Sequence, residues 1–350
     1  MILTQCQLFA YRLPLTESVF IRGHSLQERE GLLIHLVSDT GHEGWGDIAP
    51  LPGFSRETLA EARQQARLAC TRMEGLKYND KPDLLESLLP SVRFGFDSAY
   101  MMLSADFHNT GAGVWLAGET SMVSLSALLA GSTDACVAAA QRAVTREYET
   151  FKLKVGQGTV EEQVERIRRV RDVLPSKAVL RLDANRAWSL ETARAIAKAL
   201  PDFLPAYVEE PLADITQLMA FYESTGWALA LDETLHGLKP GQPLPDIQGV
   251  VAWILKPTLM GAIDDIVAWQ GRANRTDKVA IISAAYESGV GIRMLAEIAS
   301  RISTWAAGLD TYRFLAADVF EPRLDFDAGW IDLHDARTLL VQPTHLTRVA

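Results

Sequence analysis

Short apolar runs alternate with longer amphipathic stretches from about residue 121 onward. The amphipathic stretches, such as 160–173 and 190–200, have the period of helices, and the apolar runs have the length of buried strands. Eight such runs occur, at 123–128, 151–155, 178–183, 206–209, 228–232, 250–256, 279–283 and 309–314. They predict an α/β fold, a (β/α)8 barrel of the TIM type over residues 121–314. An open doubly wound sheet is the alternative that the same alternation allows.

The first 120 residues have a different pattern, in which strands come before helices. Residues 1–14 alternate like a strand, and the runs 31–38 and 43–49 predict a hairpin. Helices are expected over 55–73, with Ser55 at the start, and over 94–107. Strands and helices in separate blocks indicate an α+β domain over residues 1–120.

Composition narrows the range of partners. The chain has 34 basic and 44 acidic residues, and a net charge of −10 argues against nucleic acid as a partner. No segment approaches the roughly 18 consecutive apolar residues of a membrane span, so no membrane partner is expected. Three widely spaced cysteines and no secretion signal indicate a cytoplasmic protein without a disulfide framework.

Ionisable residues stand at the carboxyl ends of five consecutive predicted strands. They are Lys154, Asp183, Glu209, Asp232 and Lys256, and successive members lie 23 to 29 positions apart, about one strand–helix unit. In a barrel they would lie side by side around the rim that carries active sites. A single acid in such a place is commonly a helix cap or a surface residue, but five in register indicate a site.

Side chains two positions apart on a strand share a face, which adds two residues to this rim. Lys152 shares a face with Lys154, and Arg181 shares one with Asp183. Two ammonium groups that point into a barrel mouth would repel each other unless acids or a substrate anion compensate them.

Asp183, Glu209 and Asp232 together offer only oxygen ligands. Such a set suits Mg²⁺ or Mn²⁺, with water or substrate oxygens completing the coordination. The structural alternative is that the acids form ion pairs with Lys152, Lys154 and Lys256, a buried network that would cost desolvation.

A weaker candidate follows the seventh predicted strand. Backbone amides at Glu287, Ser288 and Gly289 could bind an anion at a helix start, or could simply be capped. The seven histidines form no spaced constellation and are interpreted as surface or core residues.

A divalent metal between lysines suits removal of a proton next to a carboxylate. The metal stabilises the second negative charge that forms on the carboxylate, which becomes an enediolate. A free lysine is protonated at pH 7, but Lys152 and the metal both favour the neutral amine of Lys154 and so would lower its pKa.

Several stretches carry a family resemblance. They are 44–55 (GWGDIAPLPGFS), 152–156 (KLKVG), 181–188 (RLDANRAW), 209–211 (EEP), 232–233 (DE) and 254–258 (ILKPT), with a looser match at 282–289 (ISAAYESG). Together they resemble the enolase superfamily, in its muconate-lactonizing-like branch, and within it the o-succinylbenzoate synthase family of menaquinone biosynthesis.

The resemblance implies an architecture and a reaction. The α+β domain would cap the barrel mouth, and residues 315–350 would return towards it. The reaction would be the syn dehydration of a small carboxylate, 2-succinyl-6-hydroxy-2,4-cyclohexadiene-1-carboxylate. Lys154 would be the general base and acid, and Lys256 would stabilise the enediolate from across the ring.

The resemblance also implies the ligands and contacts. Asp183, Glu209 and Asp232 would bind the metal, and Lys152 would assist Lys154. Substrate contacts are expected from Ser283, Arg181, Gly53 and Phe54. The sequence departs from the serine-rich family pattern at Ala284 and Ala285, and the loop around Arg22 matches loosely.

Two other functions fit the same sequence. An N-succinylamino acid racemase, a dipeptide epimerase or a muconate cycloisomerase would use the same scaffold, because a racemase needs two lysines on opposite faces. A non-catalytic scaffold protein would have lost at least one rim residue, and none is missing.

Overall fold

The computed structural model describes residues 1–77, 83–109, 121–302, 304–326 and 328–350. The predicted domain boundary at residue 120 lies outside these ranges. No helix in the described ranges is both long and apolar enough to cross a membrane.

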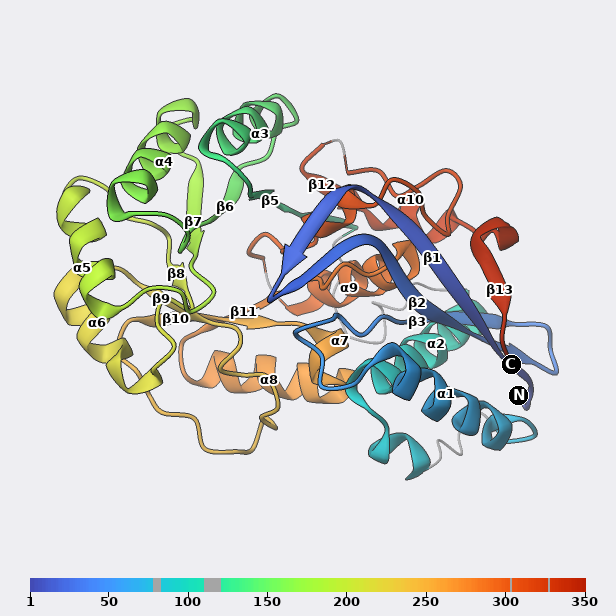
Figure 1. The fold of residues 1–350 in the computed structure, drawn as a ribbon. Coiled ribbons are helices and arrows are strands. Elements are labelled where there is room, and N and C mark those ends of the chain that lie inside the picture. The colour runs from blue at the N-terminus through green and yellow to red at the C-terminus, as the bar shows by residue number, and fades with distance from the viewer. Residues whose placement is uncertain (78–82, 110–120, 303, 327) are drawn as a thin grey trace.

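The N-terminal region is an antiparallel sheet covered by two helices (Figure 1). The sheet has the order β13-β1-β2-β3 and the helices follow it in sequence. The bounds are β1 (Leu3–Ile21), β2 (His24–Ser38), β3 (Glu43–Ile48), α1 (Leu59–Met73), a 3₁₀ turn (Asp83–Ser87), α2 (Pro90–His108) and, from the C-terminus, β13 (Leu346–Arg348). The predicted hairpin is confirmed, and β1 and β2 extend well beyond the predicted runs.

The start of α1 differs from the prediction. Thr58, not Ser55, caps the helix and forms a reciprocal capping box with Glu61. Ser55 instead accepts a hydrogen bond from the backbone N–H of Leu51 in the preceding turn, at 2.8 Å from its Oγ.

Close packing explains the second glycine of the Gly-Trp-Gly stretch. A Cβ on Gly46 would lie 1.9 Å from the carbonyl oxygen of Gly95. Glycine therefore lets α2 pack directly on β3.

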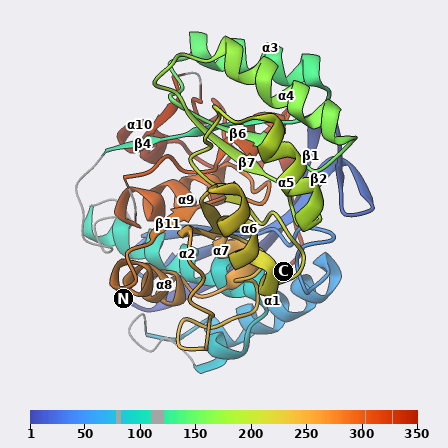
Figure 2. The ribbon, with the colours of Figure 1, turned by 90° about the vertical axis from the view of Figure 1, so that its left-hand side faces the viewer.

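The second region is a curled parallel sheet whose strands follow one another in chain order. The strands are β5 (Ser126–Leu129), β6 (Thr150–Lys154), β7 (Val179–Asp183), β8 (Val208–Glu209), β9 (Leu229–Leu231), β10 (Val250–Leu255) and β11 (Val279–Ile282). The connecting helices are α3 (Thr133–Thr145), α4 (Val160–Val173), α5 (Leu190–Ala199), α6 (Leu218–Thr225), α7 (Pro257–Met260), α8 (Ile263–Arg275) and α9 (Gly289–Ile302). Figure 2 shows α3 to α6 covering the outside of the strands. The consecutive order excludes the doubly wound alternative.

The prediction of an eighth strand at residues 309–314 is wrong. Residues 310–314 form a 3₁₀ helix (Asp310–Phe314), in which the Asp310 carboxylate pairs with Arg313 and accepts the N–H of Leu128. The preceding segment closes the ring instead. The Ser126 N–H donates to the carbonyl oxygen of Ala307 at 2.9 Å, and the Gly308 N–H donates to that of Ile282 at 2.9 Å. The eighth position is thus held by two residues that bridge β5 and β11.

The alternation predicted for the strands is confirmed at β9. Ala230 belongs to a small cluster inside the ring, with Tyr207, Ala252, Ile254 and Ile281. Leu229 and Leu231 face the other way, into the large core shared with the outer helices.

The C-terminal residues contact both regions. After a short sheet of β4 (Met122–Ser124) and β12 (Trp330–Asp332) come α10 (Leu333–Thr338) and β13, which pairs with β1.

Candidate active site

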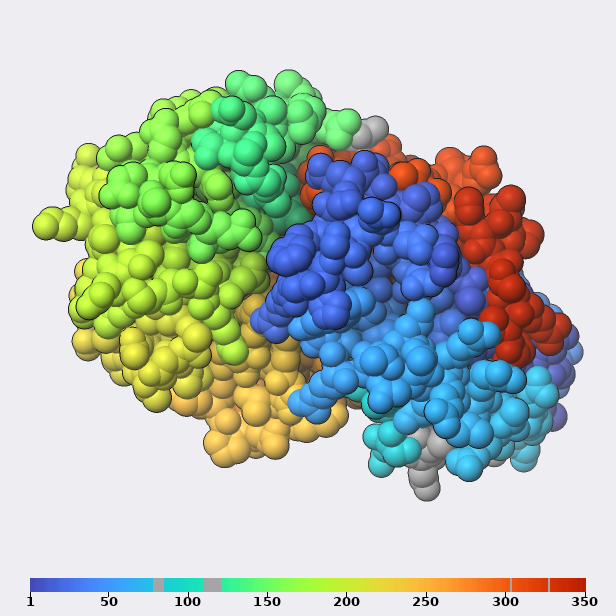
Figure 3. Space-filling view, viewed as in Figure 1, coloured from blue at the N-terminus to red at the C-terminus, as the bar shows by residue number. Residues whose placement is uncertain are grey.

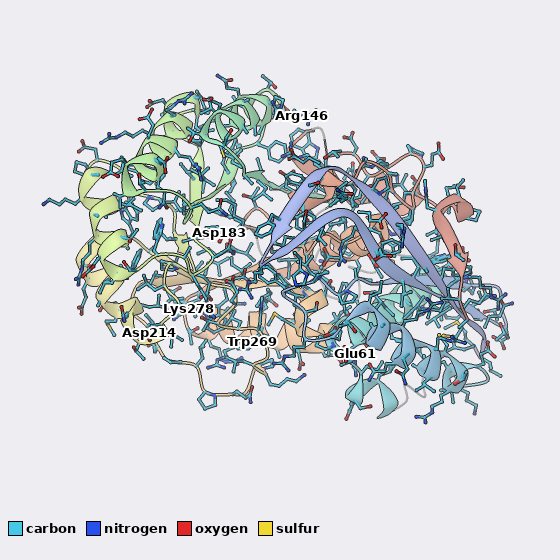
Figure 4. The ribbon with its side chains drawn as sticks, viewed as in Figure 1. Glu61, Arg146, Asp183, Asp214, Trp269 and Lys278 are labelled. Atoms are coloured by element: carbon cyan, nitrogen blue, oxygen red, sulfur yellow. The ribbon has the colours of Figure 1, made fainter. Side chains whose placement is uncertain are left out.

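A cavity of about 640 Å³ lies at the carboxyl ends of the barrel strands, under the tip of the β1–β2 hairpin. Figure 3 shows this hairpin, in dark blue, lying against the green part of the barrel. Five predicted site residues line the cavity: Lys152, Lys154, Lys256, Ser283 and Phe54. Asp183, Glu209 and Asp232 are fully buried, and each contacts one of these lysines. Figure 4 places Asp183 inside the strand ring, whereas Glu61 and Asp214 lie at the periphery.

Two lysines of β6 converge on one carboxylate. The Lys152 Nζ lies 2.9 Å from Asp183 Oδ2 and 2.9 Å from Glu209 Oε1. The Lys154 Nζ lies 2.6 Å from Asp183 Oδ2 and 2.6 Å from Asn185 Oδ1. Strand register explains the convergence, because Asp183 is paired with Lys154 on one side and with Glu209 on the other.

The third acid has a different pair of partners. Lys256, at the end of β10, donates to Asp232 Oδ2, and the His236 Nε2 lies 3.0 Å from Asp232 Oδ1. His236 therefore adds a contact to a predicted metal ligand that the general interpretation of the histidines, mostly as surface or core residues, did not include. Its spacing of four residues from Asp232 on the same loop is a signal that the sequence does contain.

Burial and pairing set the charges of this network. Burial and then the neighbouring Asp183 raise the pKa of Glu209 to about 8. Burial alone would also raise the pKa of Asp183, but Lys152 and Lys154 outweigh it and hold that pKa below its usual range. For Lys256, burial would lower the pKa, but the attraction of Asp232, together with that of Glu209 and Glu233, outweighs it and raises the pKa.

The donor set fits a hard divalent cation. Within the described ranges no three acidic, histidine or cysteine side chains are already arranged around a metal, because the ammonium groups pair with the acids. The ion pairs of the structural alternative are therefore present. Yet one cation, the Lys152 ammonium, already lies between Asp183 and Glu209, so this pair of buried acids can hold a positive charge between them. Three carboxylates at the ends of adjacent strands offer the oxygen donors that Mg²⁺ prefers.

The second acid of the Glu-Glu-Pro stretch fixes the Asp232 loop. Glu210 is fully buried and accepts the backbone N–H groups of Asp232 at 2.9 Å and Thr234 at 2.7 Å. It also accepts from Arg186 Nε at 2.8 Å. Glu210 and Arg186 both have positive φ, 40° and 64°, a strained backbone that these contacts hold in place. The sequence analysis did not single out Glu210, because only its neighbour Glu209 was identified as a candidate metal ligand.

The cap contributes two features to the site, an ion pair to the barrel and an aromatic ring that lines the cavity. Arg22, at the hairpin tip, forms a 2.9 Å ion pair with Glu233, the residue after Asp232. Its guanidinium lies 3.9 Å from the centre of the Phe54 ring, and that ring is 5.3 Å from the Lys256 ammonium. Gly53 lies in the same turn with a φ of 80°, next to Arg22. The loop around Arg22, which matched the family loosely, thus reaches the site.

Two predictions for this region are corrected. Arg181 does not line the cavity, because its guanidinium donates to the carbonyl oxygen of Ala306 and lies over the Tyr207 and Trp305 rings. Of the two alternatives for the helix start at Ser288 and Gly289, capping is the one observed, because these N–H groups donate to the buried side chains of Asp47 and Asp318. That start is therefore not available to a substrate.

Comparisons with known proteins agree with this geometry. Residues 3–103 match the family model described as "MenC, N-terminal domain", and residues 135–340 match "Enolase C-terminal domain-like". Solved structures share the fold. One is the L-Ala-D/L-Glu epimerase from Bacillus subtilis, with a TM-score of 0.85 and 19% identity over 95% of this chain and 96% of that one. Another is the dipeptide epimerase from Enterococcus faecalis V583 complexed with Mg and L-Leu-L-Tyr, with a TM-score of 0.86 and 21% identity over 95% and 97%.

Sequence relatives are more specific than these structures. The o-succinylbenzoate synthase of Edwardsiella ictaluri is 33% identical over 90% of this chain and 92% of its own length. The o-succinylbenzoate synthase of Enterobacter sp. (strain 638) is 31% identical over 92% of this chain and 97% of its own length. The chain therefore belongs to the o-succinylbenzoate synthase family of the enolase superfamily.

Proposed function

We propose that this protein catalyses the syn dehydration of 2-succinyl-6-hydroxy-2,4-cyclohexadiene-1-carboxylate to o-succinylbenzoate. The observation that carries the proposal is the placement of Lys154 and Lys256 on opposite sides of one cavity, with three buried acids between them. Lys154 ends β6 and Lys256 directly follows β10, and these two strands are four positions apart, which is half the circumference of an eight-position ring.

Lys154 is the general base. Its side chain is 33% exposed, compared with 13% for Lys152 and 10% for Lys256, so it has the best access to a bound substrate. As the neutral amine it takes the proton from the ring carbon next to the carboxylate. It then returns that proton to the hydroxyl leaving from the same face, which departs as water while the ring becomes aromatic. One base on one face therefore suffices.

Lys152 and Lys256 act as fixed charges. Lys152 is held beside the base by two carboxylates, those of Asp183 and Glu209. Lys256 stands against Asp232, with a raised pKa that keeps it protonated, and offers positive charge where the enediolate forms.

Asp183, Glu209 and Asp232 would hold Mg²⁺, which when bound stabilises negative charge on the substrate carboxylate. The turn with Phe54 and the Arg22 hairpin exclude water from the cavity, which strengthens these interactions.

Racemisation or epimerisation is the second candidate. Lys256 faces the cavity from the side opposite Lys154, which is where a second acid–base group would have to lie. The test is to supply purified protein and Mg²⁺ with the cyclohexadiene and, separately, with N-succinylamino acids. Loss of the cyclohexadiene absorbance supports the proposal. Racemisation without consumption of the cyclohexadiene would overturn it and leave the superfamily assignment standing.

A further inference from the structure

The charges that line the cavity are paired, with one exception among the cations. Within the described residues, Lys152, Lys154, Lys256 and Arg22 each have a carboxylate within 4 Å. Arg166 lines the same cavity, and none of the ion pairs among the described residues includes it. A half-buried guanidinium beside an active site without an acidic partner is a candidate anion-binding group.

Arg166 is held in place only loosely. It projects from α4, and its Nη1 donates to the backbone carbonyl of Lys154 at 3.4 Å, while its Nε donates to Thr133 Oγ1 at 3.5 Å. Both bonds are at the long limit and both acceptors are neutral. Nη2 has no hydrogen-bond partner in the described part of the chain. The guanidinium therefore keeps donor capacity for a further acceptor.

The position of Arg166 suits one end of the proposed substrate. That substrate has two carboxylates: in the proposed reaction the one on the ring would face the metal, and the other ends the succinyl side chain. The contact with the Lys154 carbonyl puts Arg166 at the end of β6, on the same strand that carries the base. A ligand whose reacting carbon meets the Lys154 amine can thus extend its side chain towards Arg166.

The wall after β11 offers fewer donors. Ala284 and Ala285 are buried and have no hydroxyl, and the Ser283 Oγ already donates to the carbonyl oxygen of Gly308 at 3.3 Å. A carboxylate at this wall would therefore find few side-chain donors there.

We propose that Arg166 binds the terminal carboxylate of the succinyl side chain and so makes this site selective for dicarboxylates. The inference rests on the proposed function and assigns a subsite within it. Glu17, an exposed acid on the hairpin, also lines the cavity but makes no ion pair with Arg166.

The test compares two ligands in the Mg²⁺-loaded protein by calorimetry. One is o-succinylbenzoate, and the other is 2-butanoylbenzoate, which has the same chain length but ends in a methyl group. For Arg166→Gln we expect the Kd of o-succinylbenzoate to rise roughly 10- to 100-fold, since one charged hydrogen-bonded contact is lost. The Kd of 2-butanoylbenzoate should stay within about twofold, and Arg166→Lys should lie between wild type and Gln because it keeps the charge but not the fork.

Arg169→Gln is the matched control, because Arg169 lies on the same helix and pairs with Asp134 at 2.8 Å away from the cavity. It should change neither Kd. The assignment is overturned if Arg166→Gln weakens both ligands equally or weakens neither. Wild-type turnover of the cyclohexadiene, measured in parallel, separates that outcome from failure of the proposed function, in which wild type neither turns over nor binds either ligand.

Discussion

The ring of strand ends and the cap above it are built in different ways. In the ring, Lys154, Asp183 and Glu209 are neighbours because they end consecutive parallel strands. In the cap, contacts join residues that are far apart in the chain: Arg22 to Glu233 across 211 positions, and Asp47 to Ser288 across 241. The ring therefore brings the proposed catalytic residues together through a local repeat, whereas the cap encloses them through long-range contacts.

The difference predicts where substitutions act. In the proposed function, a change in the ring removes a group that touches the reacting atoms or holds the metal, so it should lower kcat. A change in the cap alters how well the cavity is closed, so it should act mainly on KM and on stability.

The largest effect is expected at the base. Lys154→Arg keeps a positive charge but cannot accept a proton at pH 7, so kcat should fall by roughly 10²- to 10⁴-fold. Lys256→Arg keeps the fixed charge of its residue and should retain measurable dehydration. Steady-state loss of the cyclohexadiene absorbance measures both variants. Equal loss in the two would indicate that both lysines exchange protons, as in a racemase.

The metal ligands come next. Asp232→Asn removes a negative donor and leaves the buried Lys256 ammonium unpaired, so we expect Mg²⁺ affinity to fall by more than about 100-fold. Titration of the metal into chelator-treated protein measures this affinity. Chelation should also abolish turnover, and added Mg²⁺ or Mn²⁺ should restore it. Full turnover in metal-free buffer would contradict the ligand assignment.

Glu210 should have a smaller effect on the ring. Its carboxylate accepts two backbone N–H groups of the Asp232 loop and a bond from Arg186, and Gln cannot replace all of these acceptors. Glu210→Gln should weaken Mg²⁺ binding by roughly 10- to 100-fold, as expected for a group that orients a ligand. Unchanged Mg²⁺ affinity would show that the loop holds its shape without this acid.

The ring could be predicted from the sequence because its rule is simple. A polar residue at the end of each apolar run, one strand–helix unit apart, places side chains together whatever the loops do. The same rule failed for residues 309–314, where an apolar-looking run contains Asp310, whose carboxylate pairs with Arg313 in a 3₁₀ turn and so prevents a strand. The prediction of a substrate contact for Arg181 failed for a related reason. Strand alternation determines which face of the strand carries the side chain, but not how deep in the barrel the side chain lies.

The cap contacts could not be predicted in the same way. Nothing in the local pattern around Arg22 or Asp47 points to a partner more than 200 positions away, because such pairs are set by how two domains dock. His236 and Glu210 are intermediate cases. Each lies within four residues of a predicted metal ligand in the sequence, and each forms a hydrogen bond to Asp232.

The ion pair between Arg22 and Glu233 provides the first test of the cap. Arg22 is 42% exposed and Glu233 only 3%, so removing the guanidinium leaves a buried carboxylate without its ion pair. For Arg22→Gln we expect KM to rise by roughly fivefold with a smaller change in kcat, the scale of a partly exposed ion pair. Arg12→Gln is the control, because Arg12 pairs with Glu30 on the exposed side of the cap sheet. A fall in kcat with unchanged KM would mean that Arg22 takes part in the chemistry.

The smallest effect on turnover is expected at the other cap contact, where the measurable change is instead a pH dependence of stability. Asp47 accepts the Ser288 N–H at 2.9 Å and the Tyr11 hydroxyl at 3.0 Å, and burial raises its pKa from 3.8 to about 7. Between these two values the unfolded chain has lost this proton while the folded protein still holds it. The contribution of Asp47 to stability is therefore complete below pH 4, declines as the pH rises towards 7, and is level above it. Asp47→Asn removes this titration, so the difference in unfolding midpoint between wild type and variant should shrink from pH 5 to pH 7 and then stay constant. A difference that grows with pH would mean that Asp47 is ionised in the folded protein and that its bonds to Ser288 hold a charge.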